Sequence, residues 1–507
     1  MPAQRLRPRR FSRRCATLAT ELRRARRRRH RSVSAIAVIG GGFSGAACAI
    51  HLSRLAPRPL EILLIDPREQ VGAGLAHSTP HPDHRLNAAD SIHLLYLDAP
   101  DHFSAWLRTS GALERDPDAV AANGRIYPRR ADFGRYVHAE LTRYQACNPS
   151  GTTIRHITQR AARIASGPRG FSVSLANGET VDADACVLAV GQGGSHVPDW
   201  LRPYIRHPEC VADPWNLPAL QRIDPEHHVL ILGTGLTTVD VVSTLVSQGH
   251  RGPIEAVSRR GMRPASHSPF PPTMPRLQGL MQEVPEFVAR HGRPDSVAGI
   301  VRALRADIRR LDPARTSWHA LFDDVRDAAH VLWPHLSTPE QLRFLRHLKP
   351  WYDVHRFRIP PQSERIVQRA VATGQLAFHG AHVVSVRHGP RGFTVTFRDR
   401  GATFVRERSY TALINCTGFD GRLQSLRDPL IRGLAADGMV RSSACGLGVD
   451  VDPDSRAIGA EGSRLKGLYV IGPLTGGSLG EASSVPVITR QILQVIPELL
   501  ADLSVAR

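Results

Sequence analysis

Three glycines near the start of the chain have the spacing that binds a dinucleotide. Ser34 to Ile39 is a short apolar run, and a helical segment, Ala46 to Arg54, follows it after a turn. The residues of the turn are Gly40, Gly41, Gly42, Phe43, Ser44 and Gly45. In this pattern the first glycine permits the tight turn, the second lets the backbone approach a pyrophosphate, and the third lets the helix pack closely. A second apolar strand, Leu60 to Ile65, ends in Asp66, which is placed to accept hydrogen bonds from a ribose.

A second turn of the same kind lies much further along the chain. The apolar strand His228 to Leu232 leads into Gly233, Thr234, Gly235, Leu236, Thr237 and Thr238, so a threonine holds the third glycine position. The next strand, Ile254 to Val257, is followed by Arg259 where the first unit has its acid. A cation there suits the 2′-phosphate of NADPH, but arginine can also stack on the adenine of NADH. Two such units predict two dinucleotides, with FAD in the first site and NADH or NADPH as co-substrate in the second.

Three further apolar strands end in glycine. Ala185 to Val190 precedes Gly191, and Tyr410 to Asn415 precedes Cys416, Thr417 and Gly418. We expect these to be junctions where the chain passes between the two nucleotide domains. The third strand, Gly467 to Ile471, precedes Gly472, Glu481 and a helix through about residue 499. Such a helix N-terminus would stabilise negative charge on a reduced flavin ring.

Three polar side chains are candidates for catalysis. His77 and Asn87 follow the first unit, where the chain should pass near the flavin. They could hold flavin or substrate by hydrogen bonds, or merely satisfy the local backbone. Arg356 lies in the aromatic and cationic stretch from Trp351 to Arg358, which could bind an anionic substrate. The alternative is that these arginines form a solvated face and the aromatics are core, because no periodicity separates the two interpretations.

These elements predict an α/β fold with two dinucleotide-binding Rossmann-like domains, for FAD and NAD(P), and a helical insertion. A chain of 507 residues is long enough for two or three domains. The expected order is a basic and disordered tail (1–32), the first part of the FAD domain (33–224), the first part of the NAD(P) domain (225–275), the insertion (276–350), the return of the NAD(P) domain (351–420) and the C-terminal part of the FAD domain (421–507).

The positive charge is concentrated in the tail. Net charge is +20, and residues 1–32, with thirteen arginines and Glu21, carry +12 of it. The tail can be a polybasic arm for RNA or a membrane, a targeting peptide, or an extension from a misplaced start codon; no apolar segment of the kind found in export signals follows it. The rest of the chain is only mildly basic, so nucleic acid is not the expected partner.

Several chemistries are disfavoured by missing motifs. The sequence has no phosphate-binding loop of the ATPase type and no H-E-x-x-H, and the first glycine turn reads G-F-S-G (42–45) rather than G-x-S-x-G, so we expect neither a metal nor a nucleophilic side chain. The seven cysteines are at least 24 residues apart, which excludes a local redox pair. No run of about 18 apolar residues could span a bilayer, and a reducing cytoplasm is the natural setting.

In several segments the chain resembles bacterial FAD-NAD(P)-binding oxidoreductases, a family that includes FAD-dependent urate hydroxylase and is distantly related to flavin N-hydroxylases. These segments are VGAGLAH (71–77), RLN (85–87), YPRRADFGRY (127–136), GTGLTTVD (233–240), residues 249–264, NCTG (415–418) and GLYVIGPLT (467–475). The resemblance implies a monooxygenase that consumes NAD(P)H and oxygen and hydroxylates a nitrogen-containing metabolite, with urate to 5-hydroxyisourate in purine degradation as the leading reaction. The chain departs from the family pattern at TGGSLGE (475–481), where a basic residue near Gly476 and a tryptophan at Gly480 are expected.

Alternative functions remain open. The chain could be a flavin N-hydroxylase acting on an amino acid or amine, or an NAD(P)H-dependent flavin reductase or dehydrogenase with a protein electron acceptor. It could also be a nucleic-acid-binding protein whose flavin domain senses redox state. The Baeyer-Villiger signature is only half met, by His196 and Trp200. The sequence leaves the oligomeric state open.

Overall fold

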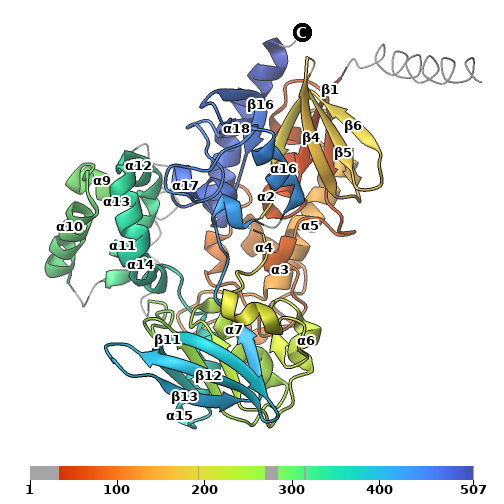
Figure 1. The fold of residues 1–507 in the computed structure, drawn as a ribbon. Helices are drawn as coiled ribbons and strands as arrows, with labels where there is room; N and C mark the ends of the chain where they lie inside the picture. Colours follow the sequence, from red (N-terminus) through yellow and green to blue (C-terminus); the bar gives the residue numbers. More distant parts are fainter. Residues whose placement is uncertain are drawn as a thin grey trace, which may run out of the picture.

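Two α/β domains and a helical subdomain form the molecule (Figure 1). The computed structural model describes residues 33–168, 170–191, 193–268, 284–312, 314, 316–426 and 428–505. The predicted fold of two Rossmann-like domains with a helical insertion is confirmed. The basic tail, 1–32, lies outside the described residues.

The first domain is built on a six-stranded sheet whose order is β15-β16-β7-β1-β2-β3. All neighbouring strands are parallel except β15 and β16. The strands are β1 (Ser34–Ile39), β2 (Leu60–Ile65), β3 (Thr153–Ile157), β7 (Ala185–Leu188), β15 (Arg456–Ile458) and β16 (Arg464–Val470). Every residue of β1 is buried because both faces of the sheet are covered, which explains its continuous apolar sequence.

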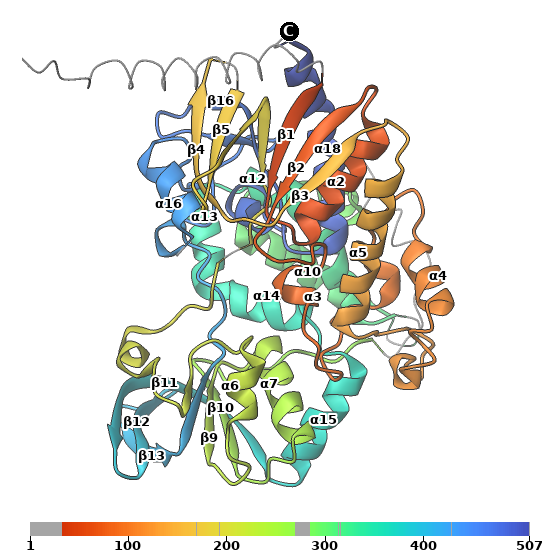
Figure 2. The same ribbon diagram turned by 90° about the vertical axis from the view of Figure 1, so that its right-hand side faces the viewer.

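Helices cover one face of this sheet, and a small sheet with one helix covers the other (Figure 2). The first face packs against α2 (Phe43–Leu55), α5 (Arg130–Ala146) and α18 (Val485–Val505). The second packs against the antiparallel strands β4 (Ala161–Gly167), β5 (Gly170–Leu175) and β6 (Thr180–Ala183), and against α16 (Pro429–Ala436). The C-terminal segment thus completes the first domain.

The second domain has a seven-stranded sheet whose order is β13-β12-β11-β10-β9-β14-β8. Its strands are β8 (Cys210–Val211), β9 (Val229–Leu232), β10 (Ile254–Ser258), β11 (Leu376–Gly389), β12 (Gly392–Asp399), β13 (Arg406–Tyr410) and β14 (Ala412–Asn415). The part from β8 to the start of β11 is parallel, and the second half of β11 forms an antiparallel extension with β12 and β13. The helices of this domain are α6 (Leu217–Gln221), α7 (Leu236–Ser247) and α15 (Pro361–Ala372).

The helical insertion stands beside both domains (Figure 1). It contains α9 (Glu286–His291), α10 (Val297–Arg310), α11 (Trp318–Asp327), α12 (Ala329–His335), α13 (Thr338–Arg343) and α14 (Lys349–Arg356). Short helices elsewhere include α3 (Gly74–His77), α4 (His102–Thr109) and α17 (Gly476–Leu479). No helix of the described ranges combines the length and apolarity needed to cross a membrane.

Two linkers join the domains and lie against each other. Ser195 and Phe419 form an antiparallel bridge, and the amide of His196 donates to the carbonyl of Gly418 at 2.9 Å. Asn415 Nδ2 adds hydrogen bonds of 2.8 and 3.0 Å to the carbonyls of His196 and Ala212. Gly418 takes part in this contact, and Gly191 precedes Ser195 by four residues in the same linker.

Candidate cofactor and active site

The first glycine turn allows no side chain at two of its positions. Gly40 has φ +105°, and a Cβ atom there would lie 2.7 Å from the carbonyl oxygen of Ala189. A Cβ atom on Gly45 would lie 1.8 Å from the carbonyl oxygen of Gly40. Helix α2 begins after Gly42 without a side-chain cap, so its first amide groups remain available to an anion. This geometry fits the pyrophosphate of a dinucleotide.

Asp66 anchors the turn. Its carboxylate accepts hydrogen bonds from the amide of Gly41 at 2.7 Å and from the Arg68 guanidinium at 2.9 and 3.0 Å. Burial opposes the charge of Asp66, but the Arg68 guanidinium and the neighbouring amides hold its pKa below the usual value. Asp66 is therefore a carboxylate that fixes the turn and orients Arg68. Its contact with a ribose stays a prediction.

The C-terminal segment returns to this turn. A Cβ atom on Gly472 would lie 2.7 Å from Ser44 Oγ, so the two segments are in close contact. The amide of Gly472 donates to Gln491 Oε1 at 2.8 Å, and Gln491 Nε2 donates to Thr475 Oγ1 at 3.2 Å. Helix α18, which carries Gln491, thereby holds residues 472–475 beside the N-terminus of α2.

His77 lies in an aromatic cluster next to the glycine turn. Its ring packs edge-on against Phe133, with centroids 4.9 Å apart, and Phe133 in turn contacts Phe43 and His93. Burial, together with the nearby charges of His93 and Arg130, lowers the pKa of His77 to about 3. His77 is therefore neutral at physiological pH and can act there only as a neutral hydrogen-bonding group.

The second glycine turn repeats the first with one difference. Gly233 has φ +119°, and a Cβ atom there would lie 2.1 Å from the carbonyl oxygen of Cys416. Thr238, at the position equivalent to Gly45, is fully buried, and its hydroxyl donates to the carbonyl of Gly233 at 2.9 Å. The threonine replaces close backbone packing with a hydrogen bond. Helix α7 begins after Gly235 without a side-chain cap, as α2 does after Gly42.

Arg259 is exposed at the carboxyl end of β10. Its neighbour Arg260 contacts the insertion, with its guanidinium 5.9 Å from the centre of the Trp351 ring and 3.3 Å from the carbonyl of His347. Arg259 thus lies at the strand end where the second unit would bind the adenosine end of a dinucleotide.

Arg356 and Glu481, predicted separately, meet where the insertion contacts the C-terminal segment. Arg356 Nε lies 3.4 Å from Glu481 Oε2, and the two side chains are only 10% and 7% exposed. Arg356 Nε makes no hydrogen bond. Tyr352, one turn earlier on α14, is half-buried, and the loss of solvent around its phenol, followed by the charge of Glu481, raises the pKa of that phenol. A cation and a carboxylate that are nearly buried, with a half-buried phenol, can together bind a zwitterionic or amine ligand.

Asn87 is not placed with this group. Its main-chain carbonyl accepts a hydrogen bond from His267 Nε2 at 2.9 Å, which ties the first domain to the segment after β10. A catalytic role for Asn87 stays a prediction.

A polar contact between the domains was not foreseen from the sequence. Arg130 of α5 pairs with Asp240 of α7 at 2.8 Å, and both side chains are nearly buried. His84 Nε2 lies 3.2 Å from the main-chain oxygen of Asp240 and 2.9 Å from Thr244 Oγ1. We call Arg130, Asp240, His84 and Thr244 the interdomain latch. Its residues lie in or beside the motifs YPRRADFGRY, RLN and GTGLTTVD, which identified the segments but not the contact.

The insertion packs against Gly480, the position at which the resemblance implies a tryptophan. A Cβ atom on Gly480 would lie 2.7 Å from Cβ of Trp333, a residue of α12. Trp333 Nε1 donates to the carbonyl of Gly477 at 2.8 Å. Gly480 therefore accommodates an indole that comes from another part of the chain.

Among the described residues, no group of three or more histidine, cysteine, aspartate or glutamate side chains is arranged to hold a metal ion.

Comparisons with known proteins support this architecture. Residues 37–193 match a protein family described as FAD-NAD(P)-binding. No curated protein matches the chain by sequence. The reduced form of ornithine hydroxylase from Pseudomonas aeruginosa is similar in structure with a TM-score of 0.60 at 17% identity, over 93% of this chain and 100% of that one. L-lysine 6-monooxygenase from Pseudomonas syringae has a TM-score of 0.59 at 17% identity, over 94% and 99%. A cadaverine monooxygenase from Erwinia amylovora has a TM-score of 0.56 at 13% identity, over 93% and 95%.

The chain shares its two-domain α/β fold with these hydroxylases. The segment that matches the FAD-NAD(P)-binding family model, residues 37–193, includes the first glycine turn. Similarity to urate hydroxylases is not among these findings.

Proposed function

We propose that this protein is an FAD-dependent monooxygenase that uses NADH or NADPH and oxygen to hydroxylate the nitrogen of a small amine or amino acid. The main support is architectural. The order of two nucleotide domains and a returning C-terminal segment matches amine and amino-acid hydroxylases over at least 93% of the chain. This proposal favours the N-hydroxylase alternative over the urate reaction expected from the resemblance.

The residues of the first domain fit FAD. The turn at Gly40 to Gly45 and the N-terminus of α2 would hold the pyrophosphate, while the segment at Gly472 lies against Ser44 on the other side. His77, neutral and partly buried, would face the flavin as a hydrogen-bonding group. When bound, FAD accepts a hydride and activates oxygen, and the protein supplies position and exclusion of water.

The pair Arg356 and Glu481 would orient the substrate. Glu481 carries a carboxylate that complements an ammonium or amine, and Arg356 carries a guanidinium that complements a carboxylate. Both groups are almost fully buried, so leaving either charge unpaired would be costly. A substrate that carries an ammonium and a carboxylate could separate Arg356 from Glu481 and pair with both of them.

A substrate panel tests the proposed function. Purified protein should be yellow, NADPH or NADH should bleach its flavin, and an amine or basic amino acid should increase both oxygen uptake and hydroxylamine formation. Ornithine, lysine, cadaverine and urate belong in the panel. Oxidation of NAD(P)H that never yields a hydroxylated product would contradict a monooxygenase and favour a reductase with a protein acceptor. Loss of urate with formation of 5-hydroxyisourate would instead support the urate reaction.

Replacement of Arg259 by alanine should change the nicotinamide preference. If Arg259 binds the 2′-phosphate, the KM for NADPH should rise about tenfold or more, since a hydrogen bond to a charged group contributes about 1.5–3 kcal/mol. The KM for NADH should change little. Arg391→Ala, an exposed arginine of the β11–β12 turn in the same domain, is the matched control. An R259A variant with unchanged KM for NADPH would show that Arg259 does not bind the 2′-phosphate.

A further inference from the structure

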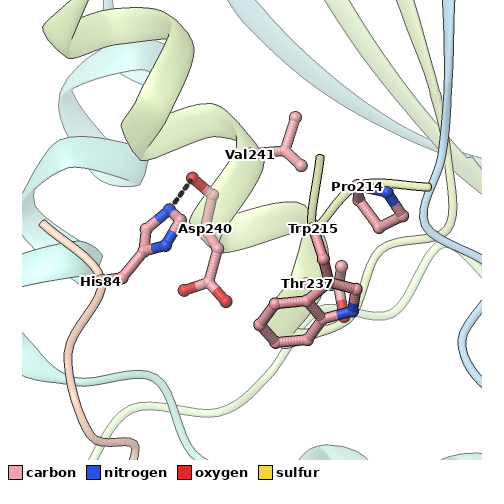
Figure 3. A pocket seen from close by; sticks show the side chains of 6 residues that line it. All are labelled: His84, Pro214, Trp215, Thr237, Asp240 and Val241. Carbon is pink, nitrogen blue, oxygen red and sulfur yellow. Dashed lines mark hydrogen bonds between the residues drawn. The ribbon is translucent and has the colours of Figure 1, made fainter. Parts of the chain in front are cut away.

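A pocket opens beside the first turn of α7, at the border between the two domains (Figure 3). It is lined by His84, Pro214, Trp215, Thr237, Asp240 and Val241, and it is an open depression with roughly 200 Å³ of empty space, part of which is bulk solvent. Five of these residues come from the second domain and His84 from the first. Of these residues, only Thr237 belongs to a glycine turn, and none belongs to the substrate pair of Arg356 and Glu481.

The strand order explains why the pocket lies there. In the parallel part of the sheet, the order β10-β9-β14-β8 puts the second glycine turn, which follows β9, between the ends of β10 and β14, and β8 lies beyond β14. Arg259 follows β10 on one side, and Pro214 and Trp215 follow β8 on the other. In such sheets a dinucleotide lies across the carboxyl edge with its pyrophosphate at the glycine turn. If Arg259 marks the adenosine end, the opposite end reaches the side of Trp215.

The side chains of the pocket have the chemistry of a site for a flat, polar ring. Trp215 is half-buried, and the Arg130 guanidinium lies 5.8 Å from its ring centre. Arg130 is itself held by Asp240 at 2.8 Å, so the indole has a fixed neighbour in the latch. Thr237 adds a hydroxyl on the first turn of α7, next to the amides that would face the pyrophosphate. An indole face binds an aromatic ring by stacking, and the hydroxyl can accept or donate a hydrogen bond.

We propose that Trp215 is the stacking platform for the nicotinamide half of the dinucleotide, with Thr237 beside it. This inference rests on the proposed use of NAD(P)H. The interdomain latch then has a second role. The Arg130–Asp240 pair joins the two domains, and the same two residues contact Trp215 or line this pocket. The pocket faces the first domain at His84, which is the direction in which a nicotinamide must be presented to a flavin.

The test compares two ligands that differ only in the nicotinamide. Binding of NADP⁺ and of 2′-phospho-ADP-ribose is measured by calorimetry on FAD-loaded wild type, Trp215→Ala, Trp215→Phe and Arg259→Ala, with NAD⁺ and ADP-ribose as a parallel pair. Loss of a stacked ring contributes about 1–3 kcal/mol, so W215A should weaken NADP⁺ about tenfold and leave 2′-phospho-ADP-ribose unchanged. W215F should retain most of the affinity for NADP⁺. R259A should weaken the two phosphorylated ligands equally.

The outcomes separate this inference from the proposed function. Wild-type protein that binds none of the four ligands would contradict the use of a nicotinamide cofactor altogether. Normal binding in wild type, with W215A weakening both members of a pair equally or neither, would overturn the role of Trp215 and leave the oxidoreductase intact. An unchanged FAD content in W215A shows that the variant is folded, and W215F tests the ring without removing it.

Discussion

Replacement of Gly45 by alanine is expected to abolish FAD binding. The added Cβ atom would lie 1.8 Å from the carbonyl oxygen of Gly40, a backbone atom of the very turn that must hold the pyrophosphate. Relief of this overlap requires α2 to move away from the turn, and the helix is packed between α5 and α18 in the core of the first domain. Overpacking in a close-packed core costs about 1–3 kcal/mol, and the displaced helix N-terminus would no longer face the phosphates.

The measurement is the ratio of flavin to protein absorbance after purification and after titration with FAD. Gly389→Ala, at a glycine whose added Cβ atom would meet nothing within 4 Å, is the control and should bind FAD as wild type does. A G45A variant that keeps full FAD content would show that the first turn is not the flavin site. If G45A is insoluble, Gly42→Ala provides the second measurement. The Cβ atom of this variant would make only an ordinary contact, at 3.4 Å with Gly74, and would instead meet the bound ligand.

The first domain should lose stability steeply as the pH falls below about 6.5. Three of its histidines, His51, His84 and His93, are at most 7% exposed, and burial lowers their pKa values to about 4, 3 and 4. Between the unfolded pKa of about 6.5 and these values, the unfolded chain binds protons that the folded chain does not. Stability is therefore full above pH 6.5 and falls as the pH drops towards 4. Each histidine contributes about 1.4 kcal/mol per pH unit in this window.

Thermal melting between pH 5 and 8 in one buffer series checks this expectation. The Tm of His51→Gln should decrease less with falling pH than the Tm of wild type. The variant lacks one of the side chains that take up a proton on unfolding. His335→Gln, at an exposed histidine of α12, should follow the wild-type curve. A Tm that stays constant from pH 7.5 to 5 would show that these histidines take up protons as readily in the folded protein as in the unfolded chain.

The sequence was most informative where structure depends on neighbours in the chain. The two glycine turns, the strands before them and the helices after them are local, so spacing alone identified Gly40, Gly45 and Gly233 with their elements. Thr238 shows the limit of the pattern. The residue departs from glycine, and only the structure reveals that its hydroxyl bonds to Gly233.

Contacts between distant segments could not be predicted in the same way. The sequence around each residue predicts a functional role for Arg356 and for Glu481, but their contact depends on how the insertion packs on the C-terminal segment. Arg130 and Asp240 lie inside recognisable segments and Trp215 lies outside them, and no periodic or spacing signal pairs these three residues. The role of such a charged or aromatic residue depends on which side chains it contacts. When those side chains are far apart in the sequence, only tertiary packing determines the contact.

Gly480 and Trp333 share one steric requirement. Because the indole of Trp333 occupies the space over Gly480 and donates to Gly477, the two positions can change only together. A chain of this fold with a bulky residue at 480 must have a smaller residue at 333 or a displaced α12. A larger side chain at one of these two positions therefore requires a smaller one at the other. The insertion thus forms part of the structure around residues 477–481 and is not an independent addition to the two nucleotide domains.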